Sequence, residues 1–188
     1  MLTEITAGPK GPFIALAYAT PDNITGKPIY GRAACYLHPE AAAAFGRAQA
    51  AARAIGLELL VFDAFRPTEA QWKLWDALPD PTFIADPRLG STHGRGIAVD
   101  LTLALPDGTP LDMGTGFDEM TELSYHAAEV SPEARRNRLL LLGVMVEAGF
   151  VHNEYEWWHY NLPTPEAYPL LSDAAAGTGL MPRSMATR

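Results

Sequence analysis

An alternating stretch, residues 97–103, is the feature that most constrains this chain. Its apolar and β-branched residues predict a half-buried β-strand that starts just after Gly96. His93 lies in the loop that leads into this strand, and Asp100 lies within it. Residues seven apart on one straight strand point to opposite faces, so both side chains can bind one ion only if the chain turns between them. Gly94 and Gly96 permit that turn, and the stretch is interpreted as half of a metal site.

A second cluster lies near the C-terminus, where residues 154–160 read Glu-Tyr-Glu-Trp-Trp-His-Tyr. Glu156 precedes His159 by three positions within this aromatic run, and exclusion of water by the aromatic rings would strengthen charge interactions beside them. His93, Asp100 and His159 make a mixed nitrogen and oxygen set that suits zinc, with a fourth position open for water. Glu156 is then free to take a proton from that water.

Other interpretations of the same residues stay open at this point. Taken alone, His93 and Asp100 are equally well explained as a loop histidine and a carboxylate bonded to a neighbouring strand. Glu154 is a rival base by proximity. Glu156 and His159 would also point to opposite faces of a flat strand, so a twist, a bulge or a strand end must bring them together.

Several segments, taken together, resemble the zinc D-alanyl-D-alanine dipeptidases, which fall within the wider group of zinc D,D-peptidases. The pattern Ser-x-His-x-x-Gly-x-Ala-x-Asp occupies residues 91–100, and Glu-x-Trp-His occupies residues 156–159. The resemblance covers roughly residues 12–172. Further segments match in the family's order: residues 18–20, 22–23, 25–27, 63–67, 113–114, 117–118 and 136–140.

The resemblance implies a reaction and roles for the residues that carry it. It implies one Zn²⁺ per subunit, held by His93, Asp100 and His159, and hydrolysis of D-alanyl-D-alanine to two D-alanines. Glu156 would deprotonate the attacking water and pass the proton to the leaving amine. Arg66 would face the scissile carbonyl, where a fixed cation stabilises the developing oxyanion. Without the resemblance, an arginine at this position is more simply a structural salt bridge.

The resemblance also implies which residues bind the dipeptide. Tyr18, Ser91 and Thr92 would hold the substrate's ends, and Asp118 would face its ammonium group. A charged end bound in a closed site excludes longer acylated peptides, so cell-wall precursors with the same D-Ala-D-Ala end would be spared. Thr92 stands where a serine is expected, and Gly94 stands where a serine is common.

Two rival functions accompany this hypothesis. The nearer rival is a related zinc D,D-carboxypeptidase, or an L,D- or D,D-endopeptidase, acting on cell-wall peptides. The second is a zinc-stabilised binding protein without turnover, which needs the three ligands but not Glu156. Serine or cysteine hydrolysis is unsupported, because no candidate nucleophile has an assigned base.

Length and composition bound the remaining expectations. The 188 residues predict a single catalytic domain, with a core at about 12–172 and a C-terminal tail at about 173–188. A net charge of -8 disfavours nucleic acid as a partner, because phosphate binding needs a basic face. Cys35 is the only cysteine, so it forms no intrachain disulfide and is expected to be buried. The expected partner is a small dipeptide, and the sequence permits a homo-oligomer.

The sequence also predicts a cellular location and a fold. Residues 1–10 lack a basic start followed by an apolar core, so no signal peptide is evident, and no apolar run predicts membrane association. A cytoplasmic location is therefore expected. The predicted fold is an α+β domain with an antiparallel sheet flanked by helices. Strands are predicted at 13–18, 57–62, 97–103 and, as two short pieces, 150–161; helices are predicted at 39–55, 68–78 and 131–149.

Some finer expectations concern the ends of helices and their buried faces. Thr68 is predicted to be the N-cap of its helix. The last long helix is expected to bury a stripe of Leu139, Leu140, Leu142, Val144 and Met145, with Arg135, Arg136 and Arg138 forming a solvated basic face. The residues after 164 are expected to be turn-rich and frayed.

Overall fold

The computed structural model describes residues 1–182 of the chain. Its main sheet has five strands in the order β2-β4-β5-β7-β6, and β1 and β3 form a separate two-stranded sheet. All pairings are antiparallel except that of β2 with β4, which is parallel. The strands are β1 (Thr3–Ile5), β2 (Phe13–Ile14), β3 (Cys35–Leu37), β4 (Glu58–Asp63), β5 (Ala98–Ala104), β6 (Val151–Asn153) and β7 (Glu156–Asn161).

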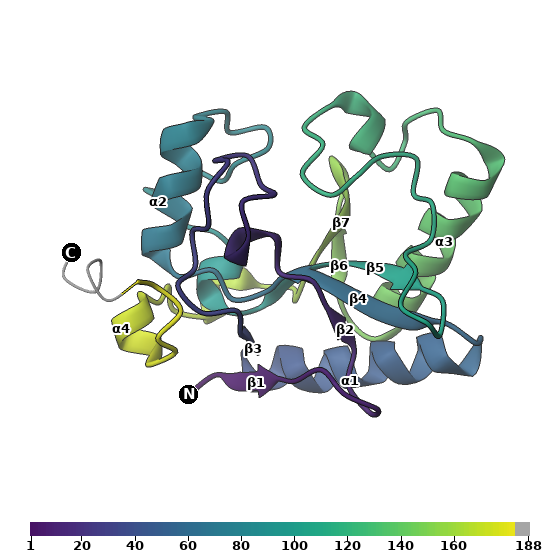
Figure 1. Cartoon of the computed structure of the whole chain (residues 1–188), viewed down its shortest axis with the longest axis horizontal. Helices are drawn as coiled ribbons and strands as arrows, with labels where there is room; N and C mark the ends of the chain where they lie inside the picture. The colour runs from purple at the N-terminus through teal and green to yellow at the C-terminus, as the bar shows by residue number, and fades with distance from the viewer. Residues whose placement is uncertain (183–188) are drawn as a thin grey trace.

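Helices lie on both sides of the main sheet (Figure 1). Below it in this view lies α1, and α2 stands on the opposite side. Buried residues of α1, α3 and the sheet form one continuous apolar core. The α-helices are α1 (Pro39–Ala54), α2 (Thr68–Ala77), α3 (Pro132–Glu147) and α4 (Asp173–Ala176), and short 3-10 helices span Ala17–Ala19, His93–Arg95, Glu122–Ser124 and Pro165–Ala167.

The central strand β5 divides the core from the opposite side of the sheet. Val99, Leu101 and Leu103 belong to the apolar core formed with α1 and α3. Asp100 and Thr102 alternate with them and therefore point to the other face. All seven residues of β5 are buried, so the prediction of a half-buried strand is wrong. The polar face of the strand, with Asp100 and Thr102, is as buried as its apolar face.

Two irregularities in strand pairing bend the sheet at the point where polar residues gather. The register of β4 against β5 shifts between Val61 and Asp63, which places Asp63 opposite Asp100. Directly opposite residues share a face, so this shift turns Asp63 toward the same side as Asp100. The pairing of β6 with β7 shifts in the same way between His152 and Asn153. Such bulges are common beside active sites because they re-aim side chains.

The predicted buried stripe of α3 is partly wrong. Leu139 is 56% exposed and Leu140 is 38% exposed, whereas Leu141 and Arg138 are buried. Four leucines in a row conceal which of them faces the core, and the helix is rotated so that Arg138 turns inward. The Arg138 guanidinium donates to the carbonyls of Met113, Leu123 and Tyr125, so a residue expected to be solvated instead ties a loop to the helix.

Two predicted boundaries also differ from the structure. The strand expected at 13–18 ends at Ile14, and Tyr18 lies in a 3-10 helix. Pro67, not Thr68, occupies the N-cap position of α2, and no side chain caps this end. The Thr68 N–H donates instead to the carbonyl of Leu171, so a distant segment satisfies the helix end.

The segment after 164 is packed rather than frayed as far as residue 182. Asp173 is buried, and its carboxylate accepts hydrogen bonds from the Thr178 hydroxyl and from the backbone N–H groups of Leu180 and Met181. Met181 packs into a second apolar cluster with Tyr18. The expected tail at 173–188 is therefore structured over its first ten residues, and its remainder lies outside the described residues.

The expected fold class is confirmed: helices and a largely antiparallel sheet make an α+β structure. Cys35 is buried, as expected. Within residues 1–182, none of the helices combines the length and the apolar character that crossing a bilayer requires.

Candidate active site

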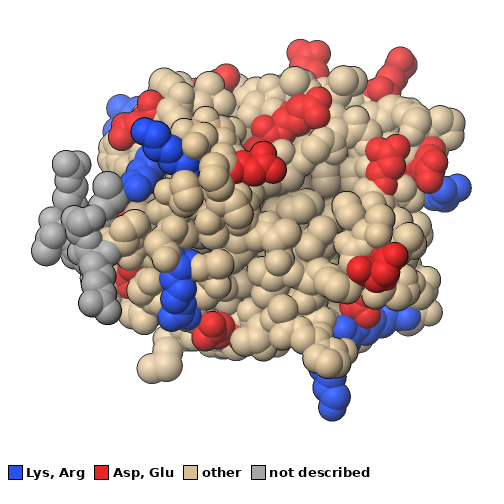
Figure 2. Space-filling model, viewed as in Figure 1, with Lys and Arg blue, Asp and Glu red and all other residues tan. Residues whose placement is uncertain are grey.

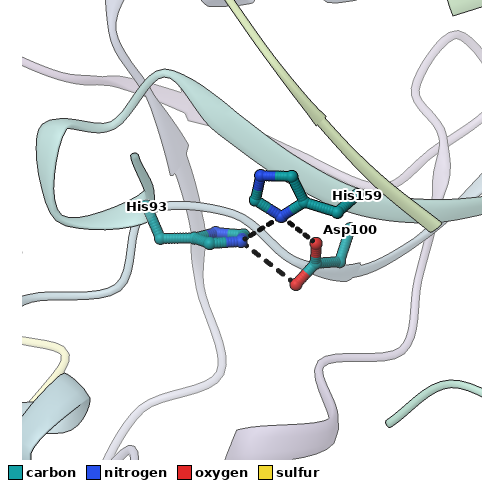
Figure 3. Close-up of side chains that lie close together, drawn as sticks. All are labelled: His93, Asp100 and His159. Atoms are coloured by element: carbon teal, nitrogen blue, oxygen red, sulfur yellow. Dashed lines mark hydrogen bonds and ion pairs between the residues drawn. The ribbon is translucent and has the colours of Figure 1, made fainter. Parts of the chain in front are cut away.

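Three side chains from two strands and a loop converge on one point (Figure 3). Asp100 on β5 lies directly opposite His159 on β7, and Oδ1 of Asp100 is 3.0 Å from Nδ1 of His159. Nε2 of His93 reaches the same point from the 3-10 helix before β5, 3.2 Å from Oδ2 of Asp100 and 3.1 Å from Nδ1 of His159. One ligand atom from each residue lies within 4.8 Å of the others.

The outer contacts of the two imidazoles show that this group of residues fits a cation. Nδ1 of His93 is 2.6 Å from the carbonyl oxygen of Ala64, which can only accept, so this nitrogen carries the proton and Nε2 presents a lone pair. Nε2 of His159 lies 3.3 Å from the Thr92 hydroxyl, an outer partner that leaves Nδ1 facing Asp100. The lone pair of His93 and the carboxylate of Asp100 then meet at the point that Nδ1 of His159 faces, the kind of ligand set, with outer partners, that zinc requires.

The electrostatics of Asp100 agree with a ligand role. Burial alone would raise the pKa of this carboxyl, but the adjacent His93 and His159 outweigh burial and hold the pKa well below its ordinary value. The carboxylate is therefore charged, and it is 2% exposed. A buried anion needs compensating positive charge, which Arg66 provides in part from 3.4 Å.

Glu156 lies at the start of β7, beside the three converging residues. Its Oε2 is 3.8 Å from Nδ1 of His159 and accepts a hydrogen bond from Nδ2 of Asn153 at 3.0 Å. Burial raises the pKa of Glu156 to about 7, although His159 opposes the shift. A carboxyl with such a pKa can both accept and return a proton near neutral pH. Glu154, the rival base, is exposed.

Arg66 lines the cavity and is held in place by a buried network of hydrogen bonds. Its Nε donates to Asp63 at 2.8 Å, and its Nη1 donates to Gln71 at 3.1 Å. The guanidinium carbon lies 4.9 Å from the centre of the Tyr18 ring. Asp63 also accepts from the Tyr30 hydroxyl at 2.8 Å. These contacts fix both the position and the plane of the guanidinium.

Tyr18 and Asp118 form a pair at another wall. The Tyr18 hydroxyl lies 3.1 and 2.9 Å from the two carboxylate oxygens of Asp118 and donates to them. Burial raises the pKa of Asp118 to about 7, against the opposing effect of Arg66. Asp118 also has a φ of 59°, in the left-handed region that costs a non-glycine residue energy and is found at functional sites.

A cavity of about 350 Å³ unites these groups, and its lining includes every residue predicted for metal binding, catalysis or substrate binding. The wall is completed by the loop between α2 and the His93 helix and by parts of β6 and β7. The predicted residues in the lining are Tyr18, Arg66, Ser91, Thr92, His93, Asp100, Asp118, Glu156 and His159.

Comparison with known sequences identifies the family of this chain. The profile of the family described as D-ala-D-ala dipeptidase matches residues 9–172. This chain belongs to that family. The predicted family is thereby confirmed, and with it the class of enzyme, a peptidase.

Named relatives agree with the family match. The D-alanyl-D-alanine dipeptidase of Escherichia coli is 51% identical over 162 residues, which cover 85% of this chain and 83% of the relative. The enzyme of the same name from Streptomyces coelicolor is 38% identical over 176 residues, covering 80% and 87%. A solved structure of VanYB in complex with D-alanine-D-alanine shares 19% identity, with a TM-score of 0.48 over 71% of this chain and 75% of that one, a likeness too remote to bear on the site.

Thr92 and Gly94, the two departures from the expected dipeptidase pattern, both lie in close contact with other residues of the site. Thr92 keeps a hydroxyl, and this hydroxyl contacts His159. At Gly94, an added Cβ would lie 3.2 Å from a methyl carbon of Leu170 and 3.6 Å from the Arg66 carbonyl oxygen. A serine here would therefore need the Leu170 side chain to shift by a few tenths of an ångström.

Several residues of this dipeptidase site were not predicted. Asp63, Gln71 and Asn153 each bond directly to Arg66 or Glu156. Asp63 lies three residues before Arg66, and a bond between the two could have been predicted from that short spacing. Ser91 was predicted to bind substrate, and its hydroxyl accepts a hydrogen bond from the His93 N–H at 3.2 Å, so it also shapes the turn that presents His93.

The surface charge on one face of the molecule is mixed. Figure 2 shows acidic side chains scattered over the face drawn there, with basic ones between them and no continuous basic patch.

Proposed function

We propose that this protein is a zinc-dependent dipeptidase that hydrolyses D-alanyl-D-alanine to two D-alanines. The observation that carries the proposal is the convergence of His93, Asp100 and His159, with Glu156 beside them, in one small cavity. These three residues would hold the zinc ion. When bound, zinc lowers the pKa of a water molecule toward about 7 and polarises the substrate carbonyl.

The chain's own residues supply the proton transfers. Glu156 accepts a proton from the attacking water while the oxygen of that water bonds to the carbonyl carbon of the first D-alanine. The same carboxyl then donates that proton to the amide nitrogen as the peptide bond breaks, which releases the second D-alanine. The raised pKa of Glu156, about 7, suits a group that must do both.

Arg66 stabilises the negative charge that develops on the carbonyl oxygen. A guanidinium has five N–H donors, and three nitrogens of Arg66 already bond to Asp63, Gln71 and Asp100. One N–H on each terminal nitrogen is left to meet the oxyanion. Because the group is buried and already oriented, it does not have to reorganise during the reaction.

Asp118 provides the selectivity for a free amino end. Its carboxylate, fixed by the Tyr18 hydroxyl, would pair with the substrate ammonium, and Ser91 and Thr92 would contact the other parts of the dipeptide. An N-acylated peptide offers no positive charge and brings extra bulk to the same wall. The proposed partner is therefore the free dipeptide.

Metal analysis combined with an activity assay tests the proposal. The purified protein should contain one zinc per chain and should release D-alanine from D-Ala-D-Ala; a chelator should abolish turnover, and added zinc should restore it. Full activity in protein without bound metal would overturn the proposal. Comparable hydrolysis of N-acetyl-D-Ala-D-Ala would favour the related carboxypeptidase instead.

A further inference from the structure

Gln71 is a buried amide that connects two parts of the site. It lies on α2 and is 2% exposed. Its Oε1 accepts from Nη1 of Arg66 at 3.1 Å, and its Nε2 donates to the Ala85 carbonyl at 2.8 Å. A buried amide left without partners is costly, so both contacts constrain where Gln71 can lie.

The Ala85 end of this bridge belongs to the cavity wall. Residues 81–85, in the loop after α2, all line the cavity that also contains Arg66. Ile84 in this loop is buried and packs in one apolar cluster with Tyr18 and with α2. Gln71 therefore joins a packed wall segment to the guanidinium.

The remaining contacts of Arg66 do not replace this one. Asp63 holds Nε at 2.8 Å, at one edge of the guanidinium group. Nη2 reaches Asp100 only at 3.4 Å, a long contact for a charged pair. With Gln71 removed, Nη1 would have no protein acceptor among the hydrogen bonds of residues 1–182. Rotation about the Nε–Cζ bond, which exchanges the two terminal nitrogens, would then be less restrained.

We propose that Gln71 is a positioning residue that aims the free N–H groups of Arg66 and makes their direction depend on the wall at residues 81–85. The inference rests on the proposed function, in which Arg66 stabilises the oxyanion. A shift of about 1 Å in such a group can cost on the order of 10²-fold in rate. The effect should appear in kcat, because the arginine acts chiefly on the transition state.

A double-mutant cycle tests this role. Gln71→Met keeps the length and burial of the side chain but removes both hydrogen bonds. We expect it to lower kcat on D-Ala-D-Ala by about 10- to 100-fold, within the cost of a misplaced group, while KM changes by about twofold or less. In an Arg66→Ala background, the same substitution should lower kcat by no more than about twofold, because the group that it positions is absent.

Gln49→Met is the matched control. Gln49 lies on α1, and its Nε2 also donates to a backbone carbonyl, that of Lys10 at 3.2 Å, away from the cavity. This variant should keep full kcat. Equal losses from Gln71→Met in both Arg66 backgrounds, or an equal loss from Gln49→Met, would overturn the proposal. If Gln71→Met does not fold, Gln71→Asn, whose amide is too short to reach both partners, takes its place in the cycle.

A second measurement separates this inference from the proposed function. If the wild-type protein does not cleave D-Ala-D-Ala, the proposed function fails, and the orientation of Arg66 is then followed by ¹⁵N NMR of its guanidinium. Positioning by Gln71 predicts two resolved Nη signals in the wild type and a single averaged signal in Gln71→Met. Identical spectra would contradict the inference whatever the activity.

Discussion

Oε2 of Glu156 lies 3.8 Å from Nδ1 of His159, although the two residues are three positions apart on one strand. On a flat strand their side chains would point to opposite faces. The pairing of β6 with β7 matches Asn153 to Glu156 but His152 to Tyr160, so β7 carries extra residues between these two pairs. This bulge turns the strand, and both side chains enter the same cavity.

Glu156→Gln should retain zinc and lose turnover. The substitution keeps the shape of the side chain and removes the group that accepts the proton, a loss of about 10²- to 10⁴-fold in kcat. Zinc content and kcat on D-Ala-D-Ala are the measurements. Glu154→Gln, two residues away in an exposed turn, is the control and should behave as wild type. A Glu156→Gln enzyme with normal kcat would show that another group is the base.

Arg66→Ala should reduce kcat by about 10²- to 10³-fold, the usual cost of removing one oxyanion donor. Arg66→Lys should recover only part of this loss, because lysine keeps the charge but not the planar fork that Asp63 and Gln71 hold. Steady-state kinetics of the two variants measure the difference. Arg136→Lys, on the exposed face of α3, is the control. Wild-type kcat in Arg66→Ala would refute the assigned role.

Asp118 should make substrate binding sensitive to pH. Its pKa is raised to about 7 by burial, and only the carboxylate form can pair with the substrate ammonium. KM for D-Ala-D-Ala is therefore expected to rise as the pH falls from 8 to about 6. Asp118→Asn should have a high KM over the whole range. A KM that does not change between these pH values in the wild type would argue against pairing with Asp118.

The same carboxyl should lower the stability of the fold as the pH rises. In the unfolded chain Asp118 titrates near its ordinary pKa of about 3.9, so between about 4 and 7 the folded state holds a proton that the unfolded state has lost. Its stabilising contribution is complete below about pH 4 and is lost as the pH rises through 7. Urea unfolding at pH 5 and pH 8 should show Asp118→Asn gaining stability relative to wild type at the higher pH. An unchanged difference between the two proteins would contradict the raised pKa.

Gly90→Ala should destabilise the protein by about 1–3 kcal/mol, because alanine is strained at the positive φ of this residue and its Cβ also meets Leu170. Gly90 has a φ of 88°, and an added Cβ would lie 2.5 Å from a methyl carbon of Leu170. Gly46→Ala, in the exposed middle of α1 with no atom within 4 Å of the added carbon, should instead stabilise by about 0.5–1 kcal/mol. Thermal unfolding of the two variants gives the comparison, and a neutral Gly90→Ala would contradict both the backbone strain and the contact with Leu170.

Much of the proposed chemistry was already predicted by the sequence. His93, Asp100, Glu156 and His159 were singled out because metal ligands and a base need particular side chains, and these stand in short patterns with characteristic spacing. The helix at 39–55 and the strand at 57–62 were predicted within a residue or so, since local periodicity and capping specify such elements. The predicted set of side chains all line one cavity.

Other features of the site depend on contacts between segments that are distant in the sequence. The two bulges that aim Asp63 and Glu156 arise from pairing between strands, which the pattern within one strand does not encode. The inward rotation of Arg138 depends on carbonyls of another loop. The connection from Arg66 through Gln71 to Ala85 likewise joins a strand end, a helix and a loop. Local sequence determines which functional groups are present. The orientation of these groups is set by hydrogen bonds and packing that form only when the whole chain has folded.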